Sequence, residues 1–230
     1  MEPWPATPEE LEAVQRKLAS EAPPPWRSGS VRSVAGCFVC FPRGYGGAGV
    51  AGDPGWAAAA WVLDGKLAAV VTVGGKAGAA YEPGLLGLRE GPLLESAVRA
   101  LPGSPEVLIV NATGRDHPRR AGLALHMGVR LGLVTVGVTD RPLLAEGPLP
   151  LEERGAASPL SIGGELIGYW VRTRRGTRPL AVHAAWRTDP EAAVAVVLAT
   201  TGASRTPEPL REARRAAREM RSGSPSRSGT

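Results

Sequence analysis

The sequence predicts one α/β domain in which an antiparallel meander leads into a mixed β-sheet with helices on both faces. The first observation is a succession of three strand-length apolar runs, of which the last two are joined by Asp64-Gly65, a strong hairpin signal. The second is the order strand, helix, strand over 106–140, which is typical of a parallel crossover. The third is size, because 230 residues with 43% hydrophobic composition can bury one sizeable core. The three apolar runs of the meander are 31–41, 56–64 and 66–75.

The first half of the chain supplies the signals for two helices. Thr7 is a suitable N-cap, Pro8 suits the first helical position, and Glu10 completes a capping box for the first helix. After the meander, Leu and Val recur at helical spacing, which predicts a helix from about Pro92 to Leu101. We therefore expect one helix before the meander and one after it.

The second half continues the alternation of strands and helices. Two β-branched apolar runs, 106–113 and 134–140, predict strands that are covered on both faces. A helix over 120–132 separates them and ends at a glycine. A loop rich in Gly and Pro over 144–164 should precede a hairpin that turns near Arg175-Gly176. Two further helices are expected at 189–200 and about 207–221.

Charge and composition divide the chain into a core and two flanking segments. We expect an N-terminal helix and linker at 1–29, a core at 30–202, and a basic helix with a disordered tail at 203–230. The last segment has seven Arg and three Glu, and so carries most of the net charge of +5. Two interpretations of it remain open: loose binding of phosphates, or a solvated, frayed end.

The two cysteines argue against a zinc site and against a disulfide. Cys37 and Cys40 lie three apart in a predicted strand, so their side chains should point to opposite faces. The first residues are acidic and proline-rich, unlike a signal peptide, and no apolar run is long enough to cross a bilayer. We expect a cytoplasmic protein with no membrane association.

Candidate site residues gather after the predicted buried strands. Ligands of open α/β sheets usually lie beyond the carboxyl ends of the strands. Asn111 ends one such strand, Glu90 is expected in the loop before the helix at Pro92, and the segment His117-Pro-Arg-Arg120 should enter the next helix. Two arginines at a helix N-terminus can bind phosphate oxygens, although the same residues could instead brace the fold.

The motifs around these residues resemble the endonuclease V family. YEPGLLGLREG resembles the family's PYIPG…FRE, and VNATGRDHPRRAG resembles its strand ending in Asp followed by GxGxxHPRRxG. VTVGVTD, VAGCFVCF and AAWRTDPEAA resemble its TIGVAK, VAGxDVxY and GHRxSxExA segments. The order and spacing match from about residue 30 to 200.

The resemblance implies an RNase H-like fold and a nuclease. The family cleaves nucleic acid near deaminated adenine, as inosine or deoxyinosine, with Mg²⁺ or Mn²⁺. Such ions prefer oxygen ligands, and two-ion hydrolysis of a phosphodiester requires several convergent carboxylates. The expected partner is therefore inosine-containing DNA or RNA.

Carried over residue by residue, the family's catalytic positions are mostly substituted. Glu90 keeps the family's Glu, whereas the two Asp positions hold Phe38 and Asn111. The late His falls on Trp186, and the Lys after GVA falls on Asp140. Glu90 and Asn111 form a weak metal-ligand set, because one carboxylate and one amide are few donors for Mg²⁺.

Two acids could replace the missing ligands. Asp116 stands beside the His117-Pro-Arg-Arg120 segment, and Asp140 ends a buried strand. His183 is three residues before Trp186 and is the other candidate for the late histidine. Phe38 and Trp186 are expected to fill the space of the lost site with apolar bulk.

The positions that bind nucleic acid in the family are better retained. Tyr81 keeps the aromatic residue of a loop that wedges beside the damaged base, where it can replace lost stacking. Glu82 opposes phosphates by its charge. The retained or matching binding positions are Tyr81, Pro83, Gly84, Leu85, His117, Arg119, Arg120 and Gly122.

Three hypotheses follow from this pattern. The favoured one is an endonuclease V-like pseudoenzyme that binds inosine-containing nucleic acid and has lost most or all cleavage. The second is an active Mg²⁺- or Mn²⁺-dependent DNA-repair nuclease with a rebuilt metal site. The third is a regulatory or structural protein that no longer binds nucleic acid.

Overall fold

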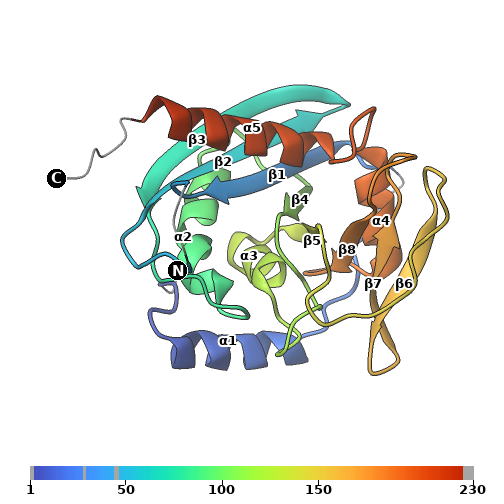
Figure 1. Ribbon diagram of the computed structural model, residues 1–230, viewed down its shortest axis with the longest axis horizontal. Helices are drawn as coiled ribbons and strands as arrows, with labels where there is room; N and C mark the ends of the chain where they lie inside the picture. Colours follow the sequence, from blue (N-terminus) through green and yellow to red (C-terminus); the bar gives the residue numbers. More distant parts are fainter. Residues whose placement is uncertain (1–2, 28–29, 44–46, 225–230) are drawn as a thin grey trace.

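A single mixed sheet organises the chain in the computed structural model, which describes residues 3–27, 30–43 and 47–224. Its strand order is β3-β2-β1-β4-β5-β8-β7-β6 (Figure 1). The strands are β1 (Ser33–Cys40), β2 (Pro54–Leu63), β3 (Lys66–Lys76), β4 (Val107–Val110), β5 (Val134–Thr139), β6 (Ala157–Ile162), β7 (Glu165–Val171) and β8 (Leu180–Ala184). The helices are α1 (Pro8–Ser20), α2 (Leu86–Arg99), α3 (Leu123–Leu131), α4 (Pro190–Ala199) and α5 (Glu208–Gly223).

The predicted meander and crossover are both confirmed. β1, β2 and β3 pair antiparallel, and the β2–β3 turn has positive φ angles of 50° at Asp64 and 72° at Gly65. A type I′ hairpin turn requires such angles. β1, β4 and β5 are parallel neighbours, and β5 pairs antiparallel with β8 of the predicted late hairpin. The carboxyl ends of β1, β4 and β5 therefore meet at one edge of the sheet.

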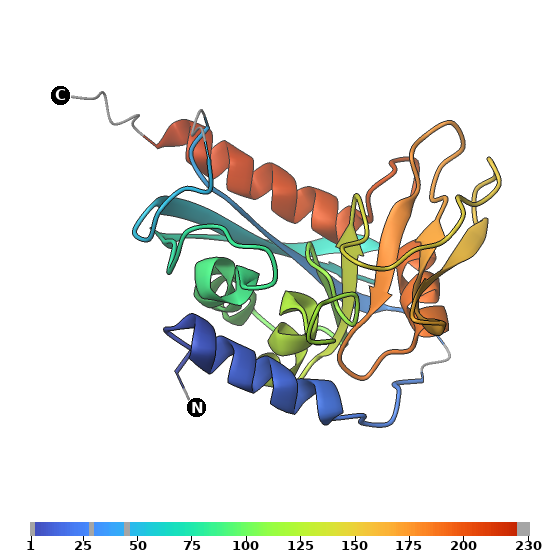
Figure 2. The same cartoon turned by 60° about the horizontal axis from the view of Figure 1, so that its bottom comes forward.

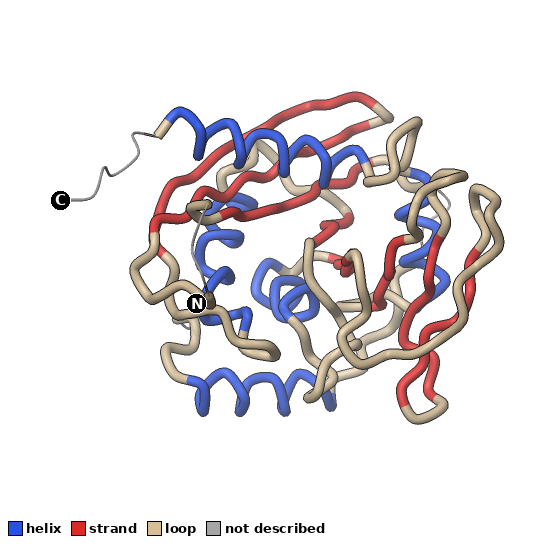
Figure 3. Tube along the Cα trace, in the orientation of Figure 1, coloured by secondary structure: helices blue, strands red, loops and turns tan. Residues whose placement is uncertain are grey.

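Helices cover both faces of the sheet. α2 and α3 pack on the face that includes Cys37 and Leu108, and α1 lies outside them. α4 and α5 pack on the opposite face, against residues such as Ile109 and Val136. Figure 2 shows α5 on one side of the strands and α1, α2 and α3 on the other, and Figure 3 shows strands in red between helices in blue. Cys37 and Cys40 are free and belong to clusters on opposite faces, as predicted.

Three boundaries differ from the sequence prediction. α2 begins at Leu86 instead of Pro92, so Glu90 lies within the helix and not in a loop. Pro92 lacks an N–H and therefore resembled a first-turn residue, but the helix continues through it. α3 begins at Leu123, so the segment 117–120 lies in a turn before the helix. The expected loop 144–164 contains the edge strand β6, whose pattern Pro159 obscured because proline suits only edges.

The C-terminal helix α5 is part of the core and not a solvated end. Leu210, Ala213 and Ala217 of α5 are fully buried against β1 and β2. At Gly36 of β1, an added Cβ would lie 2.4 Å from the backbone nitrogen of Leu210. This close approach requires a glycine in the strand and small residues in the helix. The expected disordered tail beyond Ser224 lies outside the described residues.

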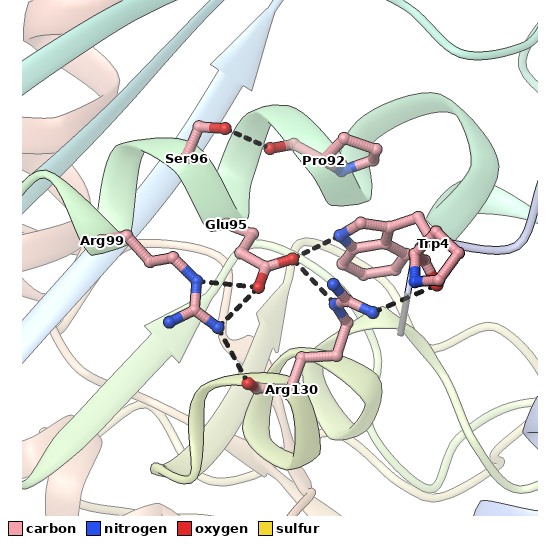
Figure 4. A network of polar contacts seen from close by, with 7 residues as sticks. Trp4, Pro92, Glu95, Ser96, Arg99 and Arg130 are labelled. Atoms are coloured by element: carbon pink, nitrogen blue, oxygen red, sulfur yellow. Dashed lines mark hydrogen bonds and ion pairs between the residues drawn. The ribbon is translucent and has the colours of Figure 1, made fainter. Parts of the chain in front are cut away.

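A buried carboxylate ties the N-terminal segment to α2 and α3. Glu95 accepts hydrogen bonds from the Trp4 indole N–H, from Arg99 at 2.8 Å and from Arg130 at 2.7 Å (Figure 4). Burial opposes the charge of Glu95, but these donors outweigh it and lower the pKa of its carboxyl. An added Cβ at Gly91 would meet the Trp4 ring at 2.4 Å. The N-terminal segment thus packs directly against the turn of α2 that follows Glu90.

No helix in the described part of the chain is long and apolar enough to cross a bilayer.

Candidate active site and base pocket

The strand register brings three of the family's catalytic positions to one edge of the sheet. Cys37 pairs with Val110 across β1 and β4, so Phe38 and Asn111 follow side by side. β5 is the next parallel strand, and Asp140 comes directly after its last residue. The structure therefore confirms that side chains after different buried strands converge, as the sequence analysis expected.

Helix α2 brings Glu90 into the same place. A cavity of about 210 Å³ lies between α2 and the strand ends. Burial raises the pKa of the Glu90 carboxyl to about 8, against the smaller opposing effect of Arg89. Burial therefore favours the neutral form of the carboxyl when no cation lies beside it, whereas a bound cation would favour the ionised form. The cavity is lined by Cys37, Phe38, Val39, Tyr81, Leu86, Glu90, Leu94 and Asn111.

Helix α5 supplies a cation that sequence reasoning missed. The Arg214 guanidinium donates to Asn111 Oδ1 at 2.8 Å and lies 5.2 Å from the centroid of the Phe38 ring. Both of its contacts are positions at which the resemblance places a carboxylate. The signal was present in the sequence, since Leu210, Ala213 and Ala217 define a buried stripe and Arg214 follows directly at its border.

The donor set does not fit a divalent cation. Phe38 has no donor atom, the amide oxygen of Asn111 accepts from Arg214, and Glu90 is the one carboxyl group in the lining of the cavity. Within the described residues, no group of three or more His, Cys, Asp and Glu could hold a metal ion. Mg²⁺ needs near-octahedral oxygen coordination, and this edge of the sheet does not provide it.

The two acids considered as replacement ligands are already engaged. Asp116 is fully buried and accepts hydrogen bonds from the backbone N–H groups of Leu143, Leu144 and Ala145 at 2.6–2.9 Å. Asp140 forms an ion pair with Arg205 at 2.6 Å. Asp116 therefore fixes the loop after β5, and Asp140 fixes the segment before α5. Among the described residues, neither acid joins Glu90 in a cluster that could hold a metal ion.

Neither candidate for the late histidine position reaches the cavity. Trp186 lies at the opposite end of β5, where its carbonyl accepts from the N–H of Thr135 at 3.0 Å. Its side chain packs on the core near Gly128, so it does not fill a lost metal site as expected. His183 is fully buried, with Nε2 at 2.9 Å from Thr139 and Nδ1 at 3.6 Å from Asp116. The antiparallel direction of β8 places Trp186 at the wrong edge.

A second cavity adjoins the first. It has a volume of about 180 Å³. Tyr81, which is 51% exposed, lies at the junction, because it and Asn111 line both cavities. The exposed residues Glu82 and Pro83 also line it. Gly84 has a φ of 82°, a left-handed conformation that favours glycine. The remaining lining residues are Leu86, Ala112, Thr113, His117, Leu123, Thr139, Arg141, Pro142 and Leu143.

The His117-Pro-Arg-Arg120 segment braces the loop that carries Tyr81. Nδ1 of His117 accepts from the N–H of Arg119 at 3.2 Å, so its Nε2–H donates to the carbonyl of Gly84 at 3.0 Å. Arg119 donates to the same carbonyl at 3.0 Å and to Gln15 of α1 at 2.6 Å. Burial lowers the pKa of His117 to about 4, which keeps it neutral. The sequence left two interpretations of this segment, phosphate binding and bracing of the fold, and these contacts match the second.

The other positions that the resemblance assigns to nucleic-acid binding lie behind the wall of the second cavity. Arg120 has a φ of 54° and bonds the carbonyl of Ile162 and the carboxylate of Glu165 at 3.3 and 3.1 Å. Leu85 is buried in a small cluster between α1 and α2. Gly122 caps α3, and an added Cβ there would lie 2.4 Å from the carbonyl oxygen of Thr113. These residues shape the wall and do not line the cavity.

The fold and the site together define a class of protein. An antiparallel meander joined to parallel strands, with helices on both faces and polar positions at the carboxyl ends of the central strands, is an RNase H-like fold with the layout of a nuclease. A family model described as Endonuclease V matches residues 15–215. The chain belongs to the Endonuclease V family.

Individual relatives agree with this assignment. The Endonuclease V of Streptomyces coelicolor is 40% identical over 219 residues, which cover 91% of this chain and 89% of that protein. The crystal structure of Endonuclease V from Streptomyces avermitilis has a TM-score of 0.84 at 34% identity and covers 95% of both chains. A structure of the Ciona intestinalis Endonuclease V has a TM-score of 0.77 at 18% identity, covers 93% of this chain and 97% of that chain, and supports the fold alone.

Proposed function

We propose that this protein binds inosine-containing nucleic acid and has lost most or all metal-dependent cleavage. The observation that carries the proposal is the contrast between two adjoining cavities. One retains an exposed tyrosine and a braced glycine loop, as a base pocket needs. The other is lined by one carboxyl group, that of Glu90, where several carboxylates are needed, and the guanidinium of Arg214 binds the amide of its Asn111.

The ligand class follows from the pocket and from the family. The Ciona intestinalis protein was crystallised in complex with a 24mer DNA containing an inosine followed by a ribo-adenosine. In this chain, Tyr81 stands at the mouth of the second cavity, where an aromatic ring can stack on a neighbouring base. Recognition of deaminated adenine would place the protein in DNA repair, through binding and not through cutting.

An active nuclease is the second candidate, and the names of the relatives favour it. This alternative requires Mg²⁺ or Mn²⁺ at the strand edge, with Glu90 as a ligand. It also requires acids that the described residues do not offer, since Asp116 and Asp140 bind other groups. Cleavage would therefore need rearrangement of the Arg214 contact with Asn111.

A combined binding and nicking assay separates the candidates. Labelled DNA with one deoxyinosine is compared with the same DNA containing deoxyadenosine, at low salt, in EDTA and in Mn²⁺. Preferential binding of the deoxyinosine strand without nicking supports the proposal. Nicking in Mn²⁺ that Glu90→Ala abolishes supports the active nuclease. Absence of binding at low salt, where the phosphate contribution is strongest, supports a regulatory or structural protein.

A further inference from the structure

Two arginines of α5 lie over a single aromatic ring at the edge of the candidate active site. Arg214 and Arg218 are four residues apart and therefore share one face of the helix. Their guanidinium carbons are 5.2 and 5.6 Å from the centroid of the Phe38 ring. Two like charges so close to one ring repel each other, and an anionic ligand between them would relieve that repulsion.

Acidic neighbours do not relieve this repulsion. Elsewhere on α5, Arg215 binds Glu212 and Glu219 at 3.0 and 2.9 Å. Arg218 is exposed, and among the described residues it forms no ion pair. Among the arginines of this helix, Arg215 belongs to a set that is paired with carboxylates, and Arg221 donates to the carbonyl of Phe41. Arg214 and Arg218 lie over the Phe38 ring and form no ion pair among the described residues.

Arg214 is similarly short of partners. Its Nε is buried without a hydrogen-bond partner in the described part of the chain, while one terminal nitrogen donates to Asn111. The acid that acts on it electrostatically is Asp140, whose carboxylate is already paired with Arg205. The pair Arg214 and Arg218 therefore presents net positive charge at the edge where Phe38 and Asn111 replace carboxylates.

We infer that Arg214 and Arg218 form a phosphate clamp that holds a nucleic-acid backbone without a divalent cation. This inference rests on the proposed function and specifies how the phosphate is held. Without carboxylates at positions 38 and 111, this edge has fewer ligands for a cation. It also has less negative charge to repel a phosphodiester. A guanidinium offers a fork of donors that matches two phosphate oxygens, and the ring of Phe38 holds both forks in place.

Two substitutions on α5 that remove the same charge provide a matched test. Arg218→Gln and Arg215→Gln each remove one positive charge from α5, but only the first removes an uncompensated guanidinium. Affinity for labelled single-stranded DNA with one deoxyinosine is measured by fluorescence anisotropy in EDTA at several salt concentrations. Arg218→Gln should weaken binding about tenfold. It should also lower the slope of log affinity against log salt by about 0.7. Arg215→Gln should change neither.

A second pair of variants protects the test against unfolding. Arg214→Lys keeps the charge and loses the fork, so it should weaken binding while the thermal unfolding temperature stays close to that of the wild type. Arg214→Gln should weaken binding further. A melting temperature unchanged in Arg218→Gln, which alters an exposed side chain, would show that the loss is not caused by unfolding.

Two outcomes would overturn the inference. One is equal weakening by Arg218→Gln and Arg215→Gln, which would indicate a diffuse charge effect. The other is binding that needs Mg²⁺ or Mn²⁺, seen as tenfold or greater tightening over EDTA. Failure of the proposed function looks different, because the wild type would then not distinguish deoxyinosine from deoxyadenosine in any buffer.

Discussion

The strand edge and the glycine loop lie side by side and have diverged in opposite ways. At the edge, Phe38 and Asn111 occupy the positions of acids, and Arg214 contacts both. At the loop, the carbonyl of Gly84 accepts hydrogen bonds from His117 and Arg119. Both residues belong to the HPRR segment, which has the same four residues as the motif of the family. The contrast is the basis of our proposal that the cation requirement was lost while nucleic-acid binding was kept.

The physical reason is that the two regions depend on different interactions. A metal site needs several charges in one place, and each substitution there weakens the whole set. The loop depends on neutral hydrogen bonds and on packing against α1 and α2, which also stabilise the fold. Substitution at the loop therefore costs stability as well as binding, whereas replacement of clustered acids by Phe38 relieves repulsion.

The largest expected effect is a gain of nicking activity when acids are restored at the strand edge. The double variant Phe38→Asp with Asn111→Asp would place three carboxyl groups around the cavity and lower the unmatched charge on Arg214. We expect Mn²⁺-dependent nicking of deoxyinosine DNA to rise by about 100-fold or more over the wild type.

Single-turnover nicking with a labelled strand measures this gain. The control adds Glu90→Ala to the double variant and should remove the new activity. If the double variant binds Mn²⁺ and still does not nick, the loss at this edge extends beyond the two acids.

Removing the aromatic ring of the loop should have the next largest effect. Stacking of a base on an aromatic side chain contributes about 1–3 kcal/mol. Tyr81→Ala should therefore lower the affinity of the protein for deoxyinosine-containing DNA about tenfold in EDTA. Tyr81→Phe should retain most of the affinity. Leu151→Ala, at a side chain that is also exposed, serves as a control that should change nothing. Equal affinity of Tyr81→Ala and wild type would remove Tyr81 from the binding surface.

The last prediction concerns stability and not binding, and it is a divergence of the two regions with pH. The pKa of Glu90 is raised to about 8, so the folded state keeps a proton that the unfolded state loses above about 4.5. Stability therefore falls as pH rises from 4.5 through 8. Glu90→Gln should raise the free energy of unfolding by up to about 5 kcal/mol at pH 9 and by little at pH 5, because one unit of pKa corresponds to about 1.4 kcal/mol.

His117 should behave in the opposite sense. Its pKa is lowered to about 4, so its contribution is present above pH 6.5 and is lost as pH falls through 4. Urea unfolding of His117→Gln and Glu90→Gln at pH 5, 7 and 9 measures both. A Glu90→Gln gain that is independent of pH would mean that Glu90 is ionised in the folded protein.

Local sequence signals determined most of the elements of this fold. The Asp64-Gly65 turn, the cap at Thr7 and the C-terminal glycine of α3 were readable because each depends on a few adjacent residues. The spacing of motifs placed Phe38, Glu90 and Asn111 at one site, and the strand register confirms their convergence. The β-branched runs predicted strands buried on both faces, since burial follows from the pattern itself.

Only the tertiary structure decided what those residues touch. The contact of Arg214 with Asn111 spans 103 positions and depends on Gly36, which lets α5 approach β1. Trp186 seemed to match the site by its motif, but the antiparallel direction of β8 carries it to the other edge. Long-range contacts of this kind depend on strand direction and on close packing, and neither is encoded in the neighbouring residues. The sequence therefore revealed which acids were missing, and the fold revealed the arginine that stands beside their positions.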